Sequence, residues 1–423
     1  MKKIYFLIGM LAMILASCSN EAYDSPQIEE PIVPNERVDI VLNGATRATA
    51  ESLRDFYVDF TADAVRYVDN DSERTEKNVV VSPLSASMML GMLANGVDAD
   101  CREKIMDYLG TNDLSNLNTL AGTLLAELPD ADNQAALGLA NSLWINQNYS
   151  LAKGFPTLME TSFEAEIRYD DFAGDGGAVR DRINSWCSSK TNGLIKDVVR
   201  EVTSEQLMVM LNTLYFKGAW NGKPFDKSKT EKAVFHGLLS DRNVDMMCAA
   251  PAERNYAEDN DFEAFSLPFG NGAYTFLVIL PKEGADASGS LPDARRVAEL
   301  REKLRGSVIG IRIPKFKWND ELLLSKVFAD GPLAVLNEKI RFTMFDPVEE
   351  FIPQVRQLTS FEVDESGAEG AAVTVTTSFT SGGAGSGETY EPHVVNVDRP
   401  FYFFINEIST GACVLSGRIA DIN

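Results

Sequence analysis

The fold is decided by the stretch Glu365-Ser366-Gly367-Ala368-Glu369-Gly370-Ala371-Ala372, which continues as Val373-Thr374-Val375-Thr376-Thr377-Ser378. In a strand, alternate residues share one face. The residues on one such face are all small and uncharged: Ala368, Gly370, Ala372, Thr374, Thr376 and Ser378. Glu369 lies on the opposite face. Such a segment can be exposed as a loop and can also slide into a sheet without burying a charge.

Residues 367–389 consist almost entirely of Gly, Ala, Ser, Thr and Val, with Glu369, Phe379 and Glu388 as the exceptions. A flexible linker is the alternative interpretation of this composition. The run Val373–Thr377 argues against a linker, because it has the high strand propensity that Gly/Ser linkers lack.

The rest of the chain predicts helices mixed with many strands. We expect helices at 53–68, at 182–198 with an interruption at 192–193, and at 322–328. Ser82 and Pro83 are typical of an N-cap and a first helical turn. We expect strands at 78–81, 140–145, 208–216, 274–280, 308–313, 358–363, 401–405 and 412–415. This order predicts a single large α+β domain with predominantly antiparallel sheets.

Over residues 50–423 the sequence resembles the serpin family. The motifs that carry the resemblance occur in family order: Asn78-Val79-Val80-Val81-Ser82-Pro83-Leu84-Ser85, Asn212-Thr213-Leu214-Tyr215-Phe216-Lys217-Gly218-Ala219-Trp220, Ile313-Pro314-Lys315-Phe316, the stretch 365–372, and Asp398-Arg399-Pro400-Phe401 with Ser416-Gly417-Arg418. The resemblance implies three β-sheets, eight or nine helices and an exposed reactive-centre loop at about 365–397.

The resemblance also implies a suicide-substrate inhibitor of serine proteases, whose partner is the protease in a covalent acyl complex. The protease cuts the loop, which then inserts into the large sheet as a new strand, a case of strand addition that releases stored strain. The implied hinge comprises Glu365, Gly367, Ala368, Glu369, Gly370, Ala371 and Ala372. The implied sheet-opening region comprises Ser82, Ser85 and Gln357. A non-inhibitory serpin that acts as a binding protein is the alternative.

The chain departs from the family pattern at several positions. Ala368 replaces the usual hinge threonine, Gly370 replaces an alanine, and Gln357 stands where family members place a histidine. Segment 331–353 fits the pattern poorly, and the loop is several residues longer than usual before Pro400.

The family spacing places the reactive bond between Ser381 and Gly382, with Phe379 and Thr380 nearby. No Lys or Arg occurs between Arg356 and Arg399, so trypsin-like enzymes have no anchor. The small side chains suit elastase-like or subtilisin-like serine proteases, and Phe379 would also suit a chymotrypsin-like enzyme or a papain-like cysteine protease.

The amino end is typical of an export signal. Met1-Lys2-Lys3 precedes 13 uncharged residues that end at Ala16, too short to span a bilayer as a helix. Leu15-Ala16-Ser17-Cys18 resembles the bacterial lipoprotein box, which implies that Cys18 is lipidated. We therefore expect a signal peptide at 1–17, an extended tether at 18–46, and a serpin domain at 47–423. The chain would be an outer-membrane lipoprotein facing the periplasm or the cell surface. An ordinary signal with a chance cysteine is the alternative.

Charge and residue counts argue against other classes of function. Acidic residues outnumber basic ones by 62 to 39, which repels nucleic acid. His236 and His393 are the two histidines, no catalytic motif surrounds either, and no C-x-x-C occurs. We predict no enzyme, no metal site, no cofactor and a monomer. Cys101, Cys187, Cys248 and Cys413 are candidates for disulfides or for buried free thiols.

Overall fold

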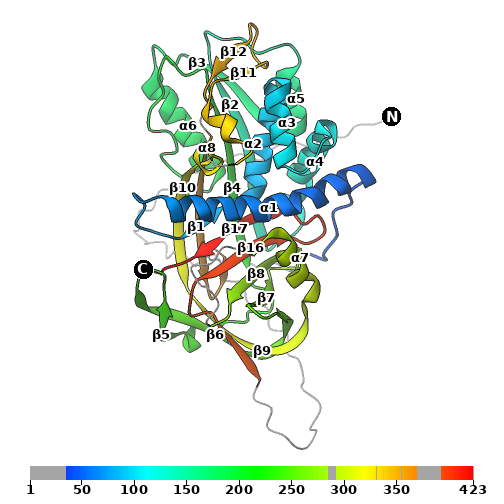
Figure 1. Cartoon of the computed structure of the whole chain (residues 1–423), viewed down its shortest axis with the longest axis vertical. Helices are drawn as coiled ribbons and strands as arrows, with labels where there is room; N and C mark the ends of the chain where they lie inside the picture. Colours follow the sequence, from blue (N-terminus) through cyan, green and yellow to red (C-terminus); the bar gives the residue numbers. More distant parts are fainter. Residues whose placement is uncertain (1–34, 284–291, 330, 354, 369–391, 423) are drawn as a thin grey trace, which may run out of the picture. The chain divides into compact units, whose positions relative to one another are not determined.

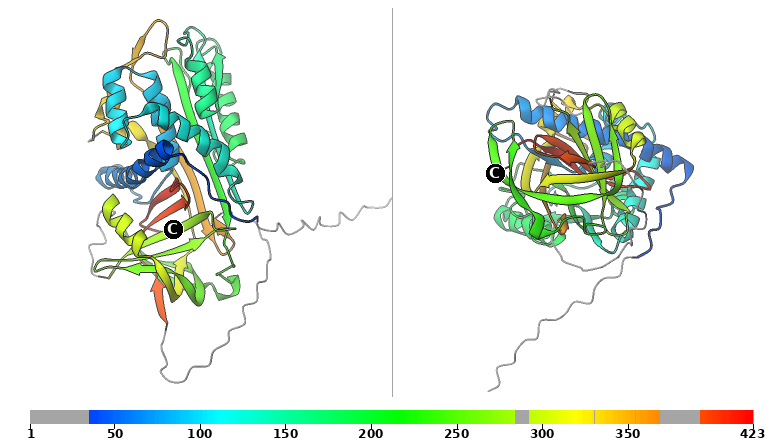
Figure 2. Two further views of the ribbon diagram at one scale, coloured as in Figure 1. Left: turned by 90° about the vertical axis from the view of Figure 1, so that its right-hand side faces the viewer. Right: turned by 90° about the horizontal axis from the view of Figure 1, so that it is seen from below.

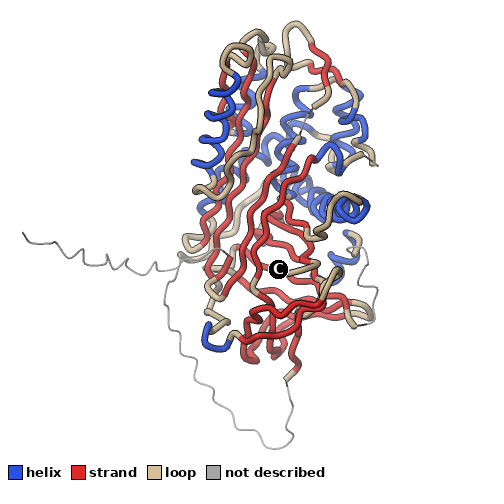
Figure 3. The backbone as a smooth tube through the Cα atoms, turned by 90° about the vertical axis from the view of Figure 1, so that its left-hand side faces the viewer, coloured by secondary structure: helices blue, strands red, loops and turns tan. Residues whose placement is uncertain are grey.

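The structure is a computed structural model that describes residues 35–283, 292–329, 331–353, 355–368 and 392–422. One sheet has six strands in the order β10-β13-β14-β4-β2-β3. These strands are β10 (Phe316–Leu323), β13 (Arg356–Asp364), β14 (Gly367–Ala368), β4 (Met208–Ala219), β2 (Ala135–Asn146) and β3 (Ala165–Asp170). All neighbours are antiparallel except β2 and β3. Figure 3 shows the long strands beside one another.

A second sheet has nine strands, of which eight follow the order β1-β17-β16-β8-β7-β6-β9-β15, while β5 pairs with β6. They are β1 (Val79–Val81), β17 (Cys413–Ile419), β16 (Phe401–Glu407), β8 (Tyr274–Pro281), β7 (Phe262–Pro268), β6 (Asp241–Glu258), β9 (Arg305–Pro314), β15 (His393–Asn396) and β5 (Glu231–His236). Strands β11 (Ile340–Phe342) and β12 (Glu349–Phe351) form the third sheet.

The described residues also form eight α-helices. They are α1 (Gly44–Asn70), α2 (Pro83–Gly96), α3 (Ala99–Tyr108), α4 (Leu114–Glu127), α5 (Phe155–Phe163), α6 (Gly176–Lys190), α7 (Ala294–Lys303) and α8 (Leu324–Val327). Three short 3-10 helices are η1 (Leu128–Asp130), η2 (Lys227–Lys229) and η3 (Ala334–Asn337). Helices α2 to α5 lie in the upper half of Figure 1, and strands β5, β6, β9 and β15 lie at its lower end.

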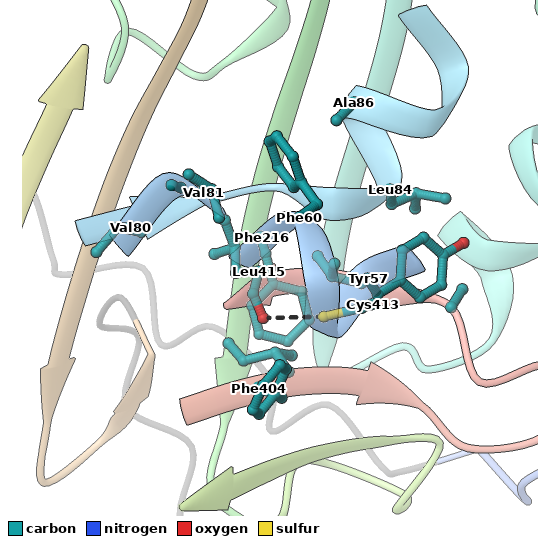
Figure 4. Packing of buried hydrophobic residues seen from close by; sticks show 14 of the residues in the cluster. Tyr57, Phe60, Val80, Val81, Leu84, Ala86, Phe216, Phe404, Cys413 and Leu415 are labelled. Carbon is teal, nitrogen blue, oxygen red and sulfur yellow. Dashed lines mark hydrogen bonds between the residues drawn. The ribbon is translucent and has the colours of Figure 1, made fainter. Parts of the chain in front are cut away.

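The core joins the helices to the nine-stranded sheet. Tyr57 and Phe60 of α1 lie near Phe404 of β16 and Leu415 of β17, all of them buried (Figure 4). Burying side chains of this size stabilises the fold by about 1.5–3 kcal/mol each. Helix α2 begins as the sequence predicts, because the Ser82 hydroxyl accepts a hydrogen bond from the backbone N–H of Ser85 (3.2 Å).

The structure confirms an α+β fold with three sheets, eight helices and mostly antiparallel pairing. Two local predictions are wrong. The helix expected at 182–198 is interrupted at 192–193 as predicted, because Asn192 and Gly193 adopt positive φ angles of 51° and 78°, but it ends at Lys190 and does not resume after the interruption. Residues 322 and 323 belong to β10, because β13 pairs with them, and the helix begins at Leu324.

Residues 35–46, which the sequence assigned to the tether, lie on the body. Ile40 and Leu42 are buried, and α1 already begins at Gly44. Asn35 and Asn133 exchange hydrogen bonds between the backbone N–H of each and the side-chain oxygen of the other (3.0 and 3.1 Å). The segment before α1 runs along the body in Figure 2. The signal peptide and residues 18–34, including Cys18, lie outside the described residues.

All four cysteines of the described residues are free thiols, and Cys101, Cys187 and Cys413 are buried. Burial raises the pKa of the Cys413 thiol to about 12. Within the same residues, no helix is both long and apolar enough to cross a membrane, and no cluster of His, Cys, Asp or Glu is placed to hold a metal ion.

Candidate functional site

The hinge residues Gly367 and Ala368 form β14, a two-residue strand between β13 and β4. Ala368 pairs with Val363 on one side and with Gly218 on the other, and both pairings are antiparallel. Ala368 is completely buried. The hinge therefore already separates β13 from β4 at this end of the six-stranded sheet.

Small residues are required on both sides of this contact. Gly367 has a φ of +149°, and a Cβ there would lie 2.0 Å from the carbonyl oxygen of Gly218. A Cβ on Gly218 would lie 2.9 Å from the Phe269 ring. The sequence identified the hinge by its small residues, and the structure gives the steric reason.

The chain reverses direction just before β14. The Asp364 carboxylate accepts hydrogen bonds from the backbone N–H groups of Ser366 (2.8 Å) and Gly367 (3.3 Å). The Trp220 indole donates to the carbonyl of Asp364 (2.8 Å), and its backbone N–H donates to the carbonyl of Ser366 (3.1 Å). The Trp220 ring is itself stacked on Phe269, with centroids 4.6 Å apart. This turn is therefore held to a rigid aromatic cluster.

Glu365 anchors the turn from the other side. Its carboxylate accepts hydrogen bonds from the Thr230 hydroxyl (2.6 Å) and pairs with the Lys315 ammonium (2.9 Å). Burial alone raises the pKa of the Glu365 carboxyl, but these two partners outweigh it and hold the pKa below its ordinary value. The sequence placed Glu365 in the hinge but did not predict either partner.

The predicted sheet-opening residues are brought together. Gln357 lies on β13, and its amide makes two hydrogen bonds to the backbone of Ser82: the side-chain oxygen accepts from the N–H, and the side-chain N–H donates to the carbonyl (both 2.9 Å). Both residues are buried. The Ser85 hydroxyl has no hydrogen-bond partner among the described residues.

Three further residues at this junction were missed by sequence reasoning. The Thr359 hydroxyl donates to the carbonyl of Val80 (2.6 Å), and the Asp320 carboxylate accepts from the N–H of Val80 (3.1 Å) and pairs with Arg74. Burial outweighs these contacts and raises the pKa of the Asp320 carboxyl. Side chains of β10 and β13 thus cover the free edge of β1. Thr359 could have been found from its spacing, since it shares a strand face with Gln357.

A groove lies at the opposite ends of β4 and β13, away from β14. A groove of about 540 Å³ is lined there by residues 207–211, Phe351, Ile352 and Arg356, together with the segment before β4. The boundary between β4 and β13 is therefore filled by β14 at one end and open to a groove at the other.

Several predicted residues lie outside the described residues. These are Glu369, Gly370, Ala371, Ala372, Phe379, Thr380, Ser381, Gly382 and Cys18. Both histidines are described and lie on different strands. His236 on β5 is 3.1 Å from the Asp241 carboxylate, and His393 on β15 is 2.6 Å from that of Glu263.

Comparison with known proteins agrees with this geometry. The family model "Serpin (serine protease inhibitor)" matches residues 57–422. The chain belongs to the serpin family. Serpin-Z10 of Arabidopsis thaliana is 30% identical over 398 residues, which cover 88% of this chain and 97% of that protein.

Two solved structures show the same fold. The thermophilic serpin tengpin in its native state has a TM-score of 0.76 at 23% identity, covering 92% of this serpin and 97% of tengpin. Human thyroxine-binding globulin complexed with thyroxine also has a TM-score of 0.76, at 21% identity and coverages of 90% and 100%. The structures that resemble this serpin thus include a thyroxine-binding protein. Serpins are generally not enzymes in the catalytic sense.

Proposed function

We propose that this serpin is an inhibitor that traps its protease by inserting the cleaved loop between β13 and β4. The observation that carries the proposal is β14. Its two residues already occupy the position that an inserted strand would extend, with the antiparallel register to both neighbours fixed.

Extending that register along β4 gives a quantitative match. Ala368 lies opposite Gly218, so Ser378 would lie opposite Met208, the first residue of β4. The strand added after Ala368 would be about 33 Å long. The small, uncharged face from Ala368 to Ser378 therefore has the length of the strand that would receive it. Glu369 would point outward, opposite Lys217.

The middle of the receiving site offers a polar position to a threonine. If the register of Gly367 and Ala368 continued, Thr374 of the inserted strand would lie between Asn212 of β4 and Gln357 of β13. The side-chain oxygen of Asn212 is buried and has no hydrogen-bond partner among the described residues. A threonine hydroxyl inserted here would supply the missing donor, and satisfying a buried acceptor is worth about 1–3 kcal/mol.

The target we propose is an elastase-like or subtilisin-like serine protease, with a papain-like cysteine protease as a further class. Cleavage between Ser381 and Gly382 would give an acyl-enzyme between this serpin, acting as a monomer, and the protease. The exported, lipid-anchored form is also a proposal: Cys18 would hold the chain on the outer membrane, facing the periplasm or the cell surface.

The test is incubation with pancreatic elastase, subtilisin and trypsin, followed by denaturing gels and mass spectrometry. We expect a covalent complex with elastase or subtilisin, none with trypsin, and a released fragment that begins at or within two residues of Gly382. Cleaved serpin should also melt well above the intact form. If each protease only cuts the loop and intact and cut forms melt together, inhibition is wrong and a non-inhibitory binding protein is the better interpretation.

A further inference from the structure

A basic segment interrupts the acidic surface of this serpin. Residues 217–232, here called the lysine segment, contain five lysines and two acidic residues, whereas the chain as a whole has 62 acidic and 39 basic residues. The segment contains the end of β4, η2 and the start of β5.

Both acidic residues of the lysine segment are already engaged. The Asp226 carboxylate accepts hydrogen bonds from the backbone N–H (2.9 Å) and the hydroxyl (2.8 Å) of Ser228, and Glu231 pairs with Arg312. Lys232 pairs with Asp245 (2.9 Å).

Three lysines within seven residues are left to face solvent. Lys223, Lys227 and Lys229 are all exposed. No ion pair between described residues includes any of them. The Asp226 carboxylate lies among them and keeps its charge, because its partner Ser228 is neutral, but the three ammonium groups outnumber it and the local potential stays positive.

The backbone that presents these lysines is held in a fixed conformation. Gly222 and Lys223 have φ angles of 67° and 47°, and a left-handed lysine is costly unless the surroundings impose it. Asn221 holds this conformation with two hydrogen bonds. Its backbone N–H donates to the carbonyl of Pro268 (2.9 Å), and its side-chain amide donates to the carbonyl of Gly270 (2.6 Å). Lys227 and Lys229 lie on η2, which the Asp226 side chain caps.

The lysine segment also touches the hinge. Ala219 pairs with Gly367, and the Thr230 hydroxyl donates to Glu365. Strand β5 continues the segment to the lower end of Figure 1, where β15 also lies. A protease that acylates at Ser381 is linked to Ala368 by at most about 47 Å of extended chain, so the lysine segment, which contacts the hinge, lies within its reach.

We propose that Lys223, Lys227 and Lys229 form a docking surface for an acidic face of the target protease. This docking surface rests on the proposed inhibitory function, and it predicts that the serpin captures proteases with an acidic face fastest. The net charge of −23 repels acidic proteases at long range, and a local positive surface beside the hinge steers the acidic face of such an enzyme to the loop.

The experiment compares two charge forms of one protease. Subtilisin is used unmodified and after succinylation, which turns its lysine ammonium groups into carboxylates, and both are titrated for active sites. The second-order rate of covalent complex formation is measured for the wild type, for K223E/K227E/K229E, and for K153E/K326E/K339E. The last variant makes the same charge change at exposed lysines far from the segment, near α5, α8 and β11.

With succinylated subtilisin we expect the wild type to react about tenfold faster than K223E/K227E/K229E at low salt, with the difference lost at 0.5 M NaCl. The control variant should stay within twofold of the wild type, and unmodified subtilisin should not prefer the wild type. Equal rates for the two triple variants would overturn the docking surface while leaving inhibition intact. Absence of covalent complexes with every form would instead remove the inhibitory function.

A last measurement, which needs no protease, compares the binding of the wild type and K223E/K227E/K229E to phosphatidylglycerol vesicles. If K223E/K227E/K229E loses binding to these vesicles but keeps the wild-type rate with both forms of subtilisin, the segment faces anionic lipid and the protease assignment is wrong.

Discussion

Replacing Ala368 by arginine tests the inserted hinge most directly. Ala368 is completely buried between Val363 and Gly218, so the new guanidinium would have no route to water within the sheet. Burying an unpaired ion costs several kcal/mol even after relaxation. Expelling β14 instead costs about 0.8 kcal/mol for the alanine methyl and about 0.5–1.5 kcal/mol for each backbone hydrogen bond lost. We therefore expect the hinge to leave the sheet.

The consequence for inhibition follows from competing rates. If reinsertion must bury the cation, a barrier higher by about 3 kcal/mol slows insertion by more than 100-fold. Hydrolysis of the acyl-enzyme then becomes faster than insertion of the loop, and the protease is released. We expect the moles of serpin consumed per mole of elastase inhibited to rise from near one to above about ten, while cleavage of the loop continues at an unchanged rate.

Two variants control for charge and for size. Ser366→Arg places the same cation two residues away at an exposed position, and Ala368→Thr keeps the buried position uncharged. Both should still form the covalent complex. If Ala368→Arg inhibits with wild-type stoichiometry, the inferred insertion between β13 and β4 is wrong.

Three further predictions concern the sheet-opening region, the hinge anchor and the lipid site. Gln357→Leu should lower the free energy of unfolding by about 2 kcal/mol, because it leaves the buried N–H of Ser82 unpaired, whereas the Ser82 carbonyl keeps its hydrogen bond from the Ala86 N–H; an unchanged urea midpoint would contradict this. The lowered pKa of Glu365 means that its stabilisation is present above the ordinary carboxyl range and is lost as the pH falls below about 5. Glu365→Gln should therefore lose less stability than the wild type between pH 6 and 3 in urea titrations, and parallel curves would refute the anchor. Cys18→Ser should release the protein from the membrane fraction or leave its signal uncut, and normal processing with membrane retention would exclude lipidation.

The sequence was most informative where one residue type alone satisfies a local constraint. Small residues at Gly367 and Ala368 pointed to a segment that can enter a sheet, and the structure places both between β13 and β4. Ser82 was recognisable as an N-cap because it precedes Pro83, and in the structure its hydroxyl accepts a hydrogen bond from the N–H of Ser85. Family position pointed to Gln357, although not to its contact with the Ser82 backbone.

Contacts between distant segments could not be predicted in this way. Arg74 and Asp320 are 246 residues apart, and neither stands in a pattern that names its partner. Glu365 meets Thr230 from 135 residues away. The interruption at Asn192 and Gly193 was predicted, but the helical apolar spacing of residues 194–198 wrongly indicated that the helix resumes after the positive φ angles.

The position of β17 has a consequence for biosynthesis. This strand, Cys413–Ile419, follows β1 by more than 300 residues along the chain, yet it lies inside the nine-stranded sheet between β1 and β16. Val79 of β1 pairs with Arg418 of β17, so β1 cannot join the sheet until β17 is present, and contacts between residues so far apart in the sequence slow folding. The nascent chain therefore cannot complete this sheet before β17 has been synthesised. Until then one edge of β16 and the whole of β1 lack their partner strand, so their backbone groups are open to pairing with other chains.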